Sequence, residues 1–218
     1  MRCGPIFQEV VLVDEVNRMH PKTQSAFLQS MEERSVSIAG VDYVLPEHHL
    51  IIATQNPVEH GGTFALPEAQ KDRFSCLVSI GYPSNERQKS ILSDVSGSSP
   101  ESSLASLEQA IDRETLTKMQ SEVRSIAMKD RVLSGLLRFV SWTREEDSFA
   151  YGLSPRAIAS FALAMRANAL LSGRDFVIPE DGRDLVIPFL AHRLMARAGG
   201  PIDAVGHAML STRYAEFL

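Results

Sequence analysis

The stretch "VVLVDEVNR", Val10 to Arg18, places two carboxylic acids directly after four apolar residues. Unbroken runs of this kind, rich in Val, are typical of strands that are buried on both faces of a parallel sheet. A second run, "LIIAT" at 50–54, and a weaker third, "CLVSI" at 76–80, follow along the chain. The three runs predict neighbouring parallel strands. The first would therefore end in acids at the edge where open α/β sheets bind ligands.

The segment between the first two runs predicts a helix and then a hairpin. "PKTQSAFLQSMEERS" (21–35) begins with a proline, which suits the first position of a helix, and carries Ala26, Phe27 and Met31 on one side. "SVSIAGVDYVL" (35–45) alternates apolar and polar residues around Ala39-Gly40, as β-hairpins do. The order strand, helix, strand predicts a right-handed βαβ unit with the hairpin as an insertion.

The remainder of the chain has a helical pattern. The only stretch rich in Ser, Gly and Pro, "SDVSGSSPESS" at 93–103, has the composition of a linker. Beyond it we expect helices near 113–125, 130–145, 155–172 and 179–197, the last broken at Pro188. The predicted division is an α/β part over residues 1–92, a linker over 93–103 and an all-helical part over 104–218.

Composition limits the class of protein. The 218 residues, 44% of them hydrophobic, suffice for one globular unit or two small ones. The net charge of −5 and the scattered Lys and Arg residues argue against a nucleic-acid-binding surface. Two cysteines, Cys3 and Cys76, are too few for a disulfide framework or a four-ligand zinc site. No run approaches the roughly 18 apolar residues that span a bilayer, and the N-terminus has no apolar core of signal-peptide length, so we expect a soluble, cytoplasmic protein.

Three residues at the predicted sheet edge suit nucleotide hydrolysis. Asp14 could bind a magnesium ion through water, and Glu15 could polarise an attacking water. Asn56, in "ATQNP", leaves the second strand at the same edge, where its amide could orient a water or contact a γ-phosphate. Each has an ordinary alternative, because strands often end in a solvated acid and an asparagine before Pro57 suits a turn. The residues alone leave both interpretations open.

Arg73 is a candidate for action on a neighbouring molecule. It follows the short helix that Pro67 can open in "LPEAQKDRF" (66–74), and we expect it to be exposed. From there it would reach a neighbour's γ-phosphate, as a finger supplied in trans, more easily than its own site. The ordinary alternative is a surface arginine paired with Asp72 or Glu68.

Arg156 lies in a helix with well-defined ends. In "GLSPRAIASFALAMRANALLSG" (152–173), Ser154 is a good N-cap, Pro155 a good first residue and Gly173 a good C-terminal stop. A cation in the first turn is disfavoured by the helix dipole. An anion such as phosphate, bound at the free N–H groups, would explain it. A solvated arginine that tolerates a small penalty explains it equally well.

The order and spacing of these motifs resemble those of MoxR-type AAA+ ATPases, a group of ring-forming P-loop ATPases. The likeness runs through "GPIFQEVVLVDEVNRMHPKTQSAFLQSMEERSVSIAG", "LIIATQNPVEHGGTFALPEAQKDRF", "GYPS", "GLSPRA" and "ALLSGRDFVIPED", and it covers roughly residues 4–197. It implies a partial P-loop AAA+ core, with parallel strands, flanking helices and a β-hairpin insertion, followed by an all-helical lid domain.

The resemblance also implies roles for individual residues. Asp14 and Glu15 resemble the Walker B pair, which binds Mg²⁺ and supplies the catalytic base. Asn56 resembles the sensor 1 residue and Arg73 the trans-acting arginine finger. Arg156 resembles the sensor 2 arginine of the lid, which contacts the nucleotide and takes part in catalysis. ATP and Mg²⁺ are the implied cofactors.

Family members act as hexameric, chaperone-like motors that remodel or mature partner proteins, often together with von Willebrand factor A domain proteins. The resemblance therefore implies other AAA+ subunits of a homo-oligomeric ring, and protein substrates, as partners. The hairpin at 35–45 resembles the pre-sensor 1 hairpin, which faces the pore or a substrate. It contains no basic residue, which argues against a helicase-like DNA motor.

One departure from the family is plain. No G-x-x-x-x-G-K-[ST] loop occurs in these 218 residues, whereas the family carries it upstream of Walker B with two further strands and two helices. Without the backbone N–H groups and lysine that hold the phosphates, we expect the chain alone to be inactive. A fragment of a complete gene, a truncated gene and a split gene would each explain this. A non-catalytic ring or scaffold subunit is the competing interpretation.

Overall fold

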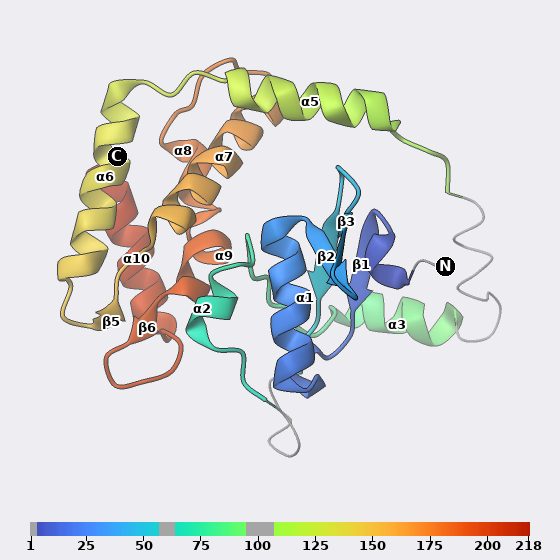
Figure 1. Cartoon of the computed structure of the whole chain (residues 1–218). Coiled ribbons are helices and arrows are strands. Elements are labelled where there is room, and N and C mark those ends of the chain that lie inside the picture. Colours follow the sequence, from blue (N-terminus) through green and yellow to red (C-terminus); the bar gives the residue numbers. More distant parts are fainter. Residues whose placement is uncertain (1–3, 57–63, 95–106) are drawn as a thin grey trace. The chain divides into compact units, whose positions relative to one another are not determined.

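The computed structural model of the chain describes residues 4–56, 64–94 and 107–218, and the helices and strands of these segments are shown in Figure 1. The chain divides into two compact units, residues 1–75 and 76–218. Most of the predicted linker, residues 93–103, lies outside the described residues. The division into residues 1–92, 93–103 and 104–218 therefore stays a prediction.

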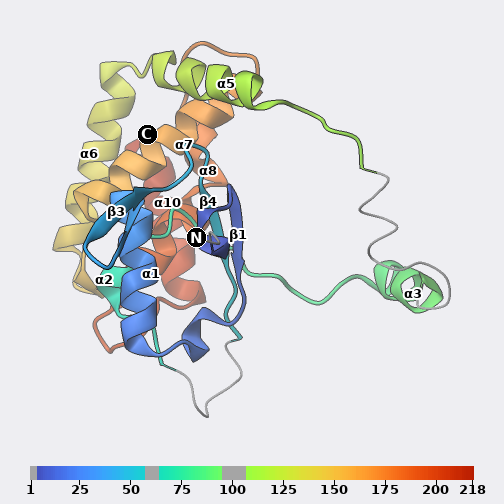
Figure 2. The same ribbon diagram turned by 45° about the vertical axis from the view of Figure 1, so that its right-hand side comes forward.

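The first unit is built on two parallel strands. β1 and β4 pair in register, with Val10 opposite Leu50 and Val13 opposite Ala53, and Figure 2 shows them side by side. This pairing confirms the predicted parallel strands on either side of a helix. In chain order the elements of this unit are η1 (Pro5–Phe7), β1 (Val10–Val13), η2 (Val16–Arg18), α1 (Pro21–Glu33), β2 (Ser35–Ile38), β3 (Val41–Val44), β4 (Leu50–Ala53) and α2 (Glu68–Lys71).

The helix and the hairpin between these strands form where the sequence predicts them. α1 begins at Pro21, the residue predicted to open the helix. β2 and β3 pair in antiparallel fashion, and Ala39 and Gly40 between them have φ values of 51° and 80°. Positive φ at both positions of a two-residue loop matches the right-handed twist of the flanking strands. Glycine adopts it without strain, which explains its place at the tip.

Only one face of the β1–β4 pair is buried, so the expected burial on both faces is wrong. Val11 and Val13 are 8% and 7% exposed and pack with Val16, Leu28 and Leu66. Their neighbours Val10 and Leu12 are 61% and 67% exposed. An apolar run of four residues is compatible with one or two covered faces, because the run itself does not show what packs on each face.

The predicted third strand, residues 76–80, is also wrong. This segment forms neither a strand nor a helix, and its Leu77, Val78 and Ile80 side chains are exposed. The Leu77 N–H donates to the Pro188 carbonyl at 2.8 Å. Because a strand needs a partner that takes up its backbone groups, apolar character alone did not suffice here.

The second unit is predominantly helical. The predicted helices 113–125 and 130–145 are confirmed to the residue. Phe139, Phe161, Met165, Leu210 and Tyr214 belong to one buried core, and α10 packs against α6 and α9 (Figure 1). The elements are α3 (Asn85–Asp94), α5 (Arg113–Ser125), α6 (Asp130–Glu145), β5 (Phe149–Tyr151), α7 (Pro155–Leu171), α8 (Glu180–Arg183), α9 (Val186–Leu190), η3 (Ala191–Arg193), β6 (Met195–Ala196) and α10 (Ala204–Phe217).

The region predicted as one helix over 179–197, broken at Pro188, is arranged differently. It forms α8, α9 and η3, and the helix is interrupted at Asp184–Leu185. Pro188 lies in the first turn of α9, where a missing N–H removes no helical hydrogen bond. The prediction of a break at Pro188 is therefore wrong.

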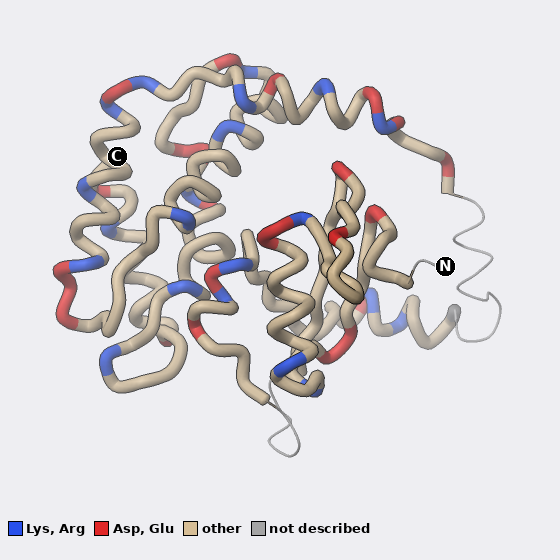
Figure 3. The backbone as a smooth tube through the Cα atoms, viewed as in Figure 1, with Lys and Arg blue, Asp and Glu red and all other residues tan. Residues whose placement is uncertain are grey.

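Charged residues of both signs are spread along the backbone in both units, as Figure 3 shows. Over the described residues, no helix is both long enough and apolar enough to span a bilayer. The Cys76 side chain is an exposed free thiol.

Candidate functional site

The two acids predicted to act on a nucleotide lie at the carboxyl end of β1. Asp14 directly follows the last paired residue of the strand and is exposed. Glu15 has left-handed backbone angles, with φ 51° and ψ 54°. This conformation costs about 1 kcal/mol for a residue with a Cβ atom and persists only where neighbouring groups hold it.

Thr54 is the group that holds both acids. Its Oγ1 donates a hydrogen bond to Asp14 Oδ1 at 2.6 Å and accepts one from the Glu15 N–H at 2.9 Å. Its backbone extends the strand pairing, because the Thr54 N–H donates to the Val13 carbonyl and the Val16 N–H donates to the Thr54 carbonyl, both at 2.9 Å. Thr54 was not predicted from the sequence. A signal was present, since a parallel register that aligns the two apolar runs places Thr54 opposite Asp14.

The Glu15 carboxylate contacts the first basic residue after it. Its Oε2 lies 3.1 Å from Arg18 Nε, and the two side chains are 38% and 50% exposed. Ion pairs this exposed contribute at most about 1 kcal/mol. The carboxylate of Glu15 is therefore held loosely, in contrast to its backbone.

The loop after β1 is fixed from the α1 side as well. Gln24 is 1% exposed, and its Nε2 donates to the Val16 carbonyl at 3.0 Å and to the Phe64 carbonyl at 3.3 Å. The Phe64 N–H in turn donates to the Asn17 carbonyl at 2.7 Å. A buried amide with satisfied hydrogen bonds fixes a loop because breaking them would strand polar groups away from water.

Asn56 lies at the same edge of the sheet, as expected. It follows Thr54 by two residues after the end of β4, and it is exposed. The first unit thus brings three predicted site residues, Asp14, Glu15 and Asn56, to the carboxyl ends of two adjacent parallel strands, where ligands of open α/β sheets bind.

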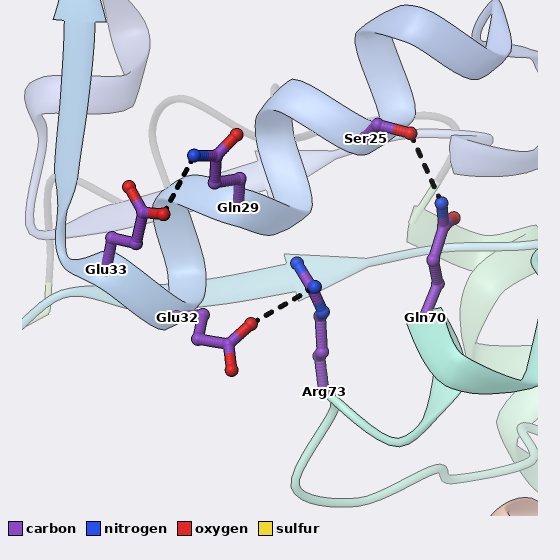
Figure 4. A pocket seen from close by; sticks show the side chains of 6 residues that line it. All are labelled: Ser25, Gln29, Glu32, Glu33, Gln70 and Arg73. Carbon is purple, nitrogen blue, oxygen red and sulfur yellow. Dashed lines mark hydrogen bonds and ion pairs between the residues drawn. The ribbon is translucent and has the colours of Figure 1, made fainter.

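Arg73 differs from the expectation of an exposed side chain. It is 29% exposed, and its Nη2 lies 3.1 Å from Glu32 Oε2 of α1. Figure 4 shows Arg73 and Gln70 pointing toward α1 across a small pocket. The pairing with Glu32 was not predicted because Glu32 is distant in sequence. The pocket is lined by Ser25, Gln29, Glu32, Glu33, Gln70 and Arg73.

Arg156 lies in the first turn of α7, whose predicted ends are confirmed. Ser154 Oγ accepts from the Ala157 N–H at 3.0 Å, and Pro155 is the first helical residue. Beyond the last turn, Gly173 has φ 73°. Arg156 itself is exposed.

The start of α7 is fixed against α6. A Cβ atom on Gly152 would lie 2.6 Å from the Cα of Arg144, so only glycine fits this approach. The Leu153 N–H donates to Thr143 Oγ1 at 3.2 Å, and Arg144 donates to the Leu153 carbonyl through Nε and Nη2. Arg156 thus follows, by three residues, the Leu153 backbone that is hydrogen-bonded to α6. Because the acids belong to the first unit, their convergence with Arg156 stays a prediction.

Within the described segments, no group of three or more His, Cys, Asp or Glu residues is placed to bind a metal ion.

Two family models match the chain. Residues 1–76 match the ATPase family associated with various cellular activities (AAA), and residues 142–206 match the AAA lid domain. The first match contains Asp14, Glu15, Asn56 and Arg73, and the second contains Arg156.

Individual proteins match nearly the whole chain. An uncharacterized Bacillus subtilis protein, YeaC, is 42% identical over 94% of the chain and 63% of its own length. The chaperone MoxR1 of Mycobacterium tuberculosis is 34% identical over 96% of the chain and 57% of its own length. A crystal structure of a candidate ATPase from Cytophaga hutchinsonii superimposes with a TM-score of 0.87 at 29% identity, over 98% of this chain and 67% of that one. The chain thus spans about three fifths of the length of these two curated relatives.

Proposed function

Since this chain belongs to the MoxR-type AAA+ proteins, we propose that it supplies the Walker B, sensor and lid portion of a motor that hydrolyses ATP to remodel or mature partner proteins. The observation that most supports this is the hydrogen bond of 2.6 Å between Thr54 Oγ1 and Asp14 Oδ1. It ties the acid after one strand to the segment that carries Asn56 after the next, at the edge suited to a ligand.

In this proposal the acids have separate tasks. Asp14 presents a carboxylate, of which Thr54 binds one oxygen, and carboxylate oxygens are ligands that Mg²⁺ prefers. A magnesium ion supplies charge neutralisation for the β- and γ-phosphates when it is bound. Glu15 accepts the proton of the water that attacks the γ-phosphate, while Asn56 orients that water.

The arginines stabilise developing negative charge. Arg156 acts from the first turn of α7, where free N–H groups also favour an anion. Arg73 acts on the nucleotide of the adjacent subunit in a hexameric ring, so its pair with Glu32 opens on assembly. The substrates are proteins, presented together with a von Willebrand factor A domain partner. The hairpin β2–β3, with Val41 and Val44 52% and 81% exposed, is the surface that faces them.

The experiment that tests this proposal compares the chain with a fusion. Because its 218 residues contain no P-loop, the chain alone is expected to show no magnesium-dependent ATP turnover. Joining it to the P-loop half of a MoxR-type protein is expected to create turnover, which Glu15→Gln abolishes. Glu145→Gln, at an exposed position of α6, is the matched control.

Two outcomes would contradict the proposal. Turnover by the chain alone that is lost with Glu15→Gln would show that the P-loop is dispensable. A fusion that forms rings without hydrolysing ATP would favour the alternative, a non-catalytic ring or scaffold subunit. A simpler check is to search the genomic sequence upstream of Met1 for an in-frame P-loop, which the proposed ATP-hydrolysing motor requires.

A further inference from the structure

We propose that Thr54 is a positioning residue whose single hydroxyl group sets the geometry of both Asp14 and Glu15. The inference rests on the proposed function for the roles of the two acids. The hydrogen bonds of Thr54 to Asp14 and Glu15 do not depend on those roles.

The hydroxyl group uses both of its hydrogen-bonding capacities at this place. It donates to Asp14 Oδ1 at 2.6 Å and accepts from the Glu15 N–H at 2.9 Å. The first distance is in the range of charge-assisted O–H···O⁻ bonds, which are stronger than neutral ones. Serine can make the same pair of bonds, whereas valine, which has the shape of threonine, can make neither.

For Asp14, the consequence is a carboxylate that is oriented before any ligand arrives. The side chain is exposed, so without a partner it would sample several rotamers. The bond to Thr54 fixes one oxygen and leaves the second available. A ligand fixed in advance binds a metal ion without a further loss of rotational freedom.

For Glu15, the consequence is a backbone held in a disfavoured conformation. With φ 51°, this residue would relax to more populated angles if nothing held its amide, and the direction of its side chain would change with it. The Thr54 side chain binds the Glu15 N–H, and the Thr54 carbonyl binds the next N–H, that of Val16, at 2.9 Å. The backbone of Glu15 and the carboxylate of Asp14 are therefore held by the same atom, Thr54 Oγ1.

The backbone contacts of Thr54 make this role separable from strand pairing. The bonds through the Thr54 N–H and carbonyl do not involve the side chain and remain in any substitution other than proline. Removing the hydroxyl group is thus expected to release the acids while β1 and β4 stay paired.

The first part of the test uses the 218-residue chain and does not depend on ATP. Amide hydrogen exchange measured by NMR is expected to be about 10-fold or more faster at Glu15 in Thr54→Val than in the wild type. Thr54→Ser should keep the wild-type rate, and Thr54→Ala, which adds no exposed methyl group in place of the hydroxyl, should behave as Val does. Thr23→Val, at an exposed position of α1, is the matched control.

The second part measures steady-state turnover in the P-loop fusion. Thr54→Val is expected to lower kcat about 10- to 100-fold with KM for ATP changed by less than about 3-fold, because the acids act on the reaction more than on nucleotide binding. Thr54→Ser is expected to restore kcat to within about 3-fold of the wild type. A merely structural role would not predict this split or this rescue.

The outcomes separate the two proposals. Unchanged exchange at Glu15 in both Val and Ala variants, or failure of serine to restore it, would overturn the positioning role. Faster exchange with unchanged kcat would overturn it too, because the acids would then act without being held. A wild-type fusion that hydrolyses no ATP would count against the proposed function, and the exchange measurements would still decide the role of Thr54.

Discussion

Arg73 and Glu32 form an ion pair within the first unit, with Arg73 Nη2 3.1 Å from Glu32 Oε2 (Figure 4). The two side chains are 29% and 41% exposed, so the pair contributes at most about 1 kcal/mol. An arginine that acts on a neighbouring subunit must first leave this carboxylate. In the proposed trans action of Arg73, Glu32 therefore competes with the neighbouring nucleotide for the guanidinium group.

Replacing Glu32 by glutamine tests this competition in the assembled P-loop fusion. Removal of the competing charge is expected to raise ATP turnover by up to about 5-fold, the factor that corresponds to roughly 1 kcal/mol. Glu33→Gln is the matched control, because Glu33 accepts a hydrogen bond from Gln29 Nε2 at 2.8 Å and lines the same pocket. Lower turnover in Glu32→Gln would show that Glu32 orients Arg73 instead of competing for it.

The sequence predicted the elements whose signals are local. The hairpin turn at Ala39-Gly40, the first residue of α1 and the cap of α7 at Ser154 each depend on residues within a few positions of one another. The same holds for α5 and α6, whose ends match the prediction. α10 was not predicted, although Asp203 Oδ1 accepts a hydrogen bond from the Gly206 N–H at 2.9 Å and so caps the helix. Gly206 is a poor helix former, and the weak amphipathicity of the segment hides its buried positions, which include Leu210 and Tyr214.

What the sequence did not predict depends on contacts between distant segments. Residues 76–80 have the composition of a strand, but a strand forms only where a partner pairs with it. Thr54 and Glu32 acquire their roles from Asp14 and Arg73, which lie 40 and 41 positions away by their residue numbers. Motif spacing predicts the groups that we propose to act on the nucleotide, whereas the groups that hold them are found only in the fold.

Gly182 is expected to tolerate no side chain. A Cβ atom there would overlap Tyr214 Oη and lie 2.8 Å from Phe161 Cζ, inside the core of the second unit. Tyr214 Oη also donates to the Pro179 carbonyl at 2.7 Å, so it cannot move without losing that bond. Gly182→Ala is expected to lower the free energy of unfolding by about 1–3 kcal/mol, measured by urea denaturation. Gly81→Ala is the control, since a Cβ atom at Gly81 meets nothing within 4 Å. Equal stabilities of the two variants would contradict the prediction.

Asp181 is expected to make the stability of the second unit depend on pH. Its side chain is 3% exposed, and Arg174 Nη1 and the Ile178 N–H donate to Oδ2 at 2.8 and 2.9 Å. Burial opposes ionisation, but the hydrogen bond from Arg174 and the Ile178 amide outweigh it and lower the pKa of Asp181. The pKa of Asp181 is lower in the folded than in the unfolded chain. The ionised carboxylate therefore stabilises the fold at a pH above the pKa that it has in the unfolded chain. That stabilisation is lost as the pH falls through the folded pKa.

Asp181→Asn measures this contribution. At pH 7 the free energy of unfolding of the variant is expected to be about 2 kcal/mol lower than that of the wild type. This loss is smaller than that for a fully buried ion pair, because the Arg174 side chain is 24% exposed and water can solvate it. The difference should shrink as the pH is lowered below about 4, where the carboxyl of the unfolded wild-type chain begins to bind a proton. Asp147→Asn is the control, because the pair of Asp147 with Arg197 is exposed. A difference that does not change between pH 7 and pH 3 would show that charge is not the cause.

Ser154 allows the capping of α7 to be separated from anion binding at the same helix end. Ser154→Ala removes the oxygen that accepts from the Ala157 N–H, and it is expected to lower the free energy of unfolding by about 1 kcal/mol. Ser154→Asp should restore that stability, because aspartate also caps well and its charge suits the helix dipole. If nucleotide phosphate binds beside Arg156, however, the added carboxylate repels it.

The P-loop fusion that carries Ser154→Asp is therefore expected to have the same midpoint of urea denaturation as the wild-type fusion. Its KM for ATP is expected to be about 5-fold or more higher. Ser154→Ala should show the reverse, with lower stability and a smaller change in KM. An aspartate variant with wild-type KM would place the phosphates away from the start of α7. Arg156 would then be an ordinary surface arginine, which is the alternative that its sequence context leaves open.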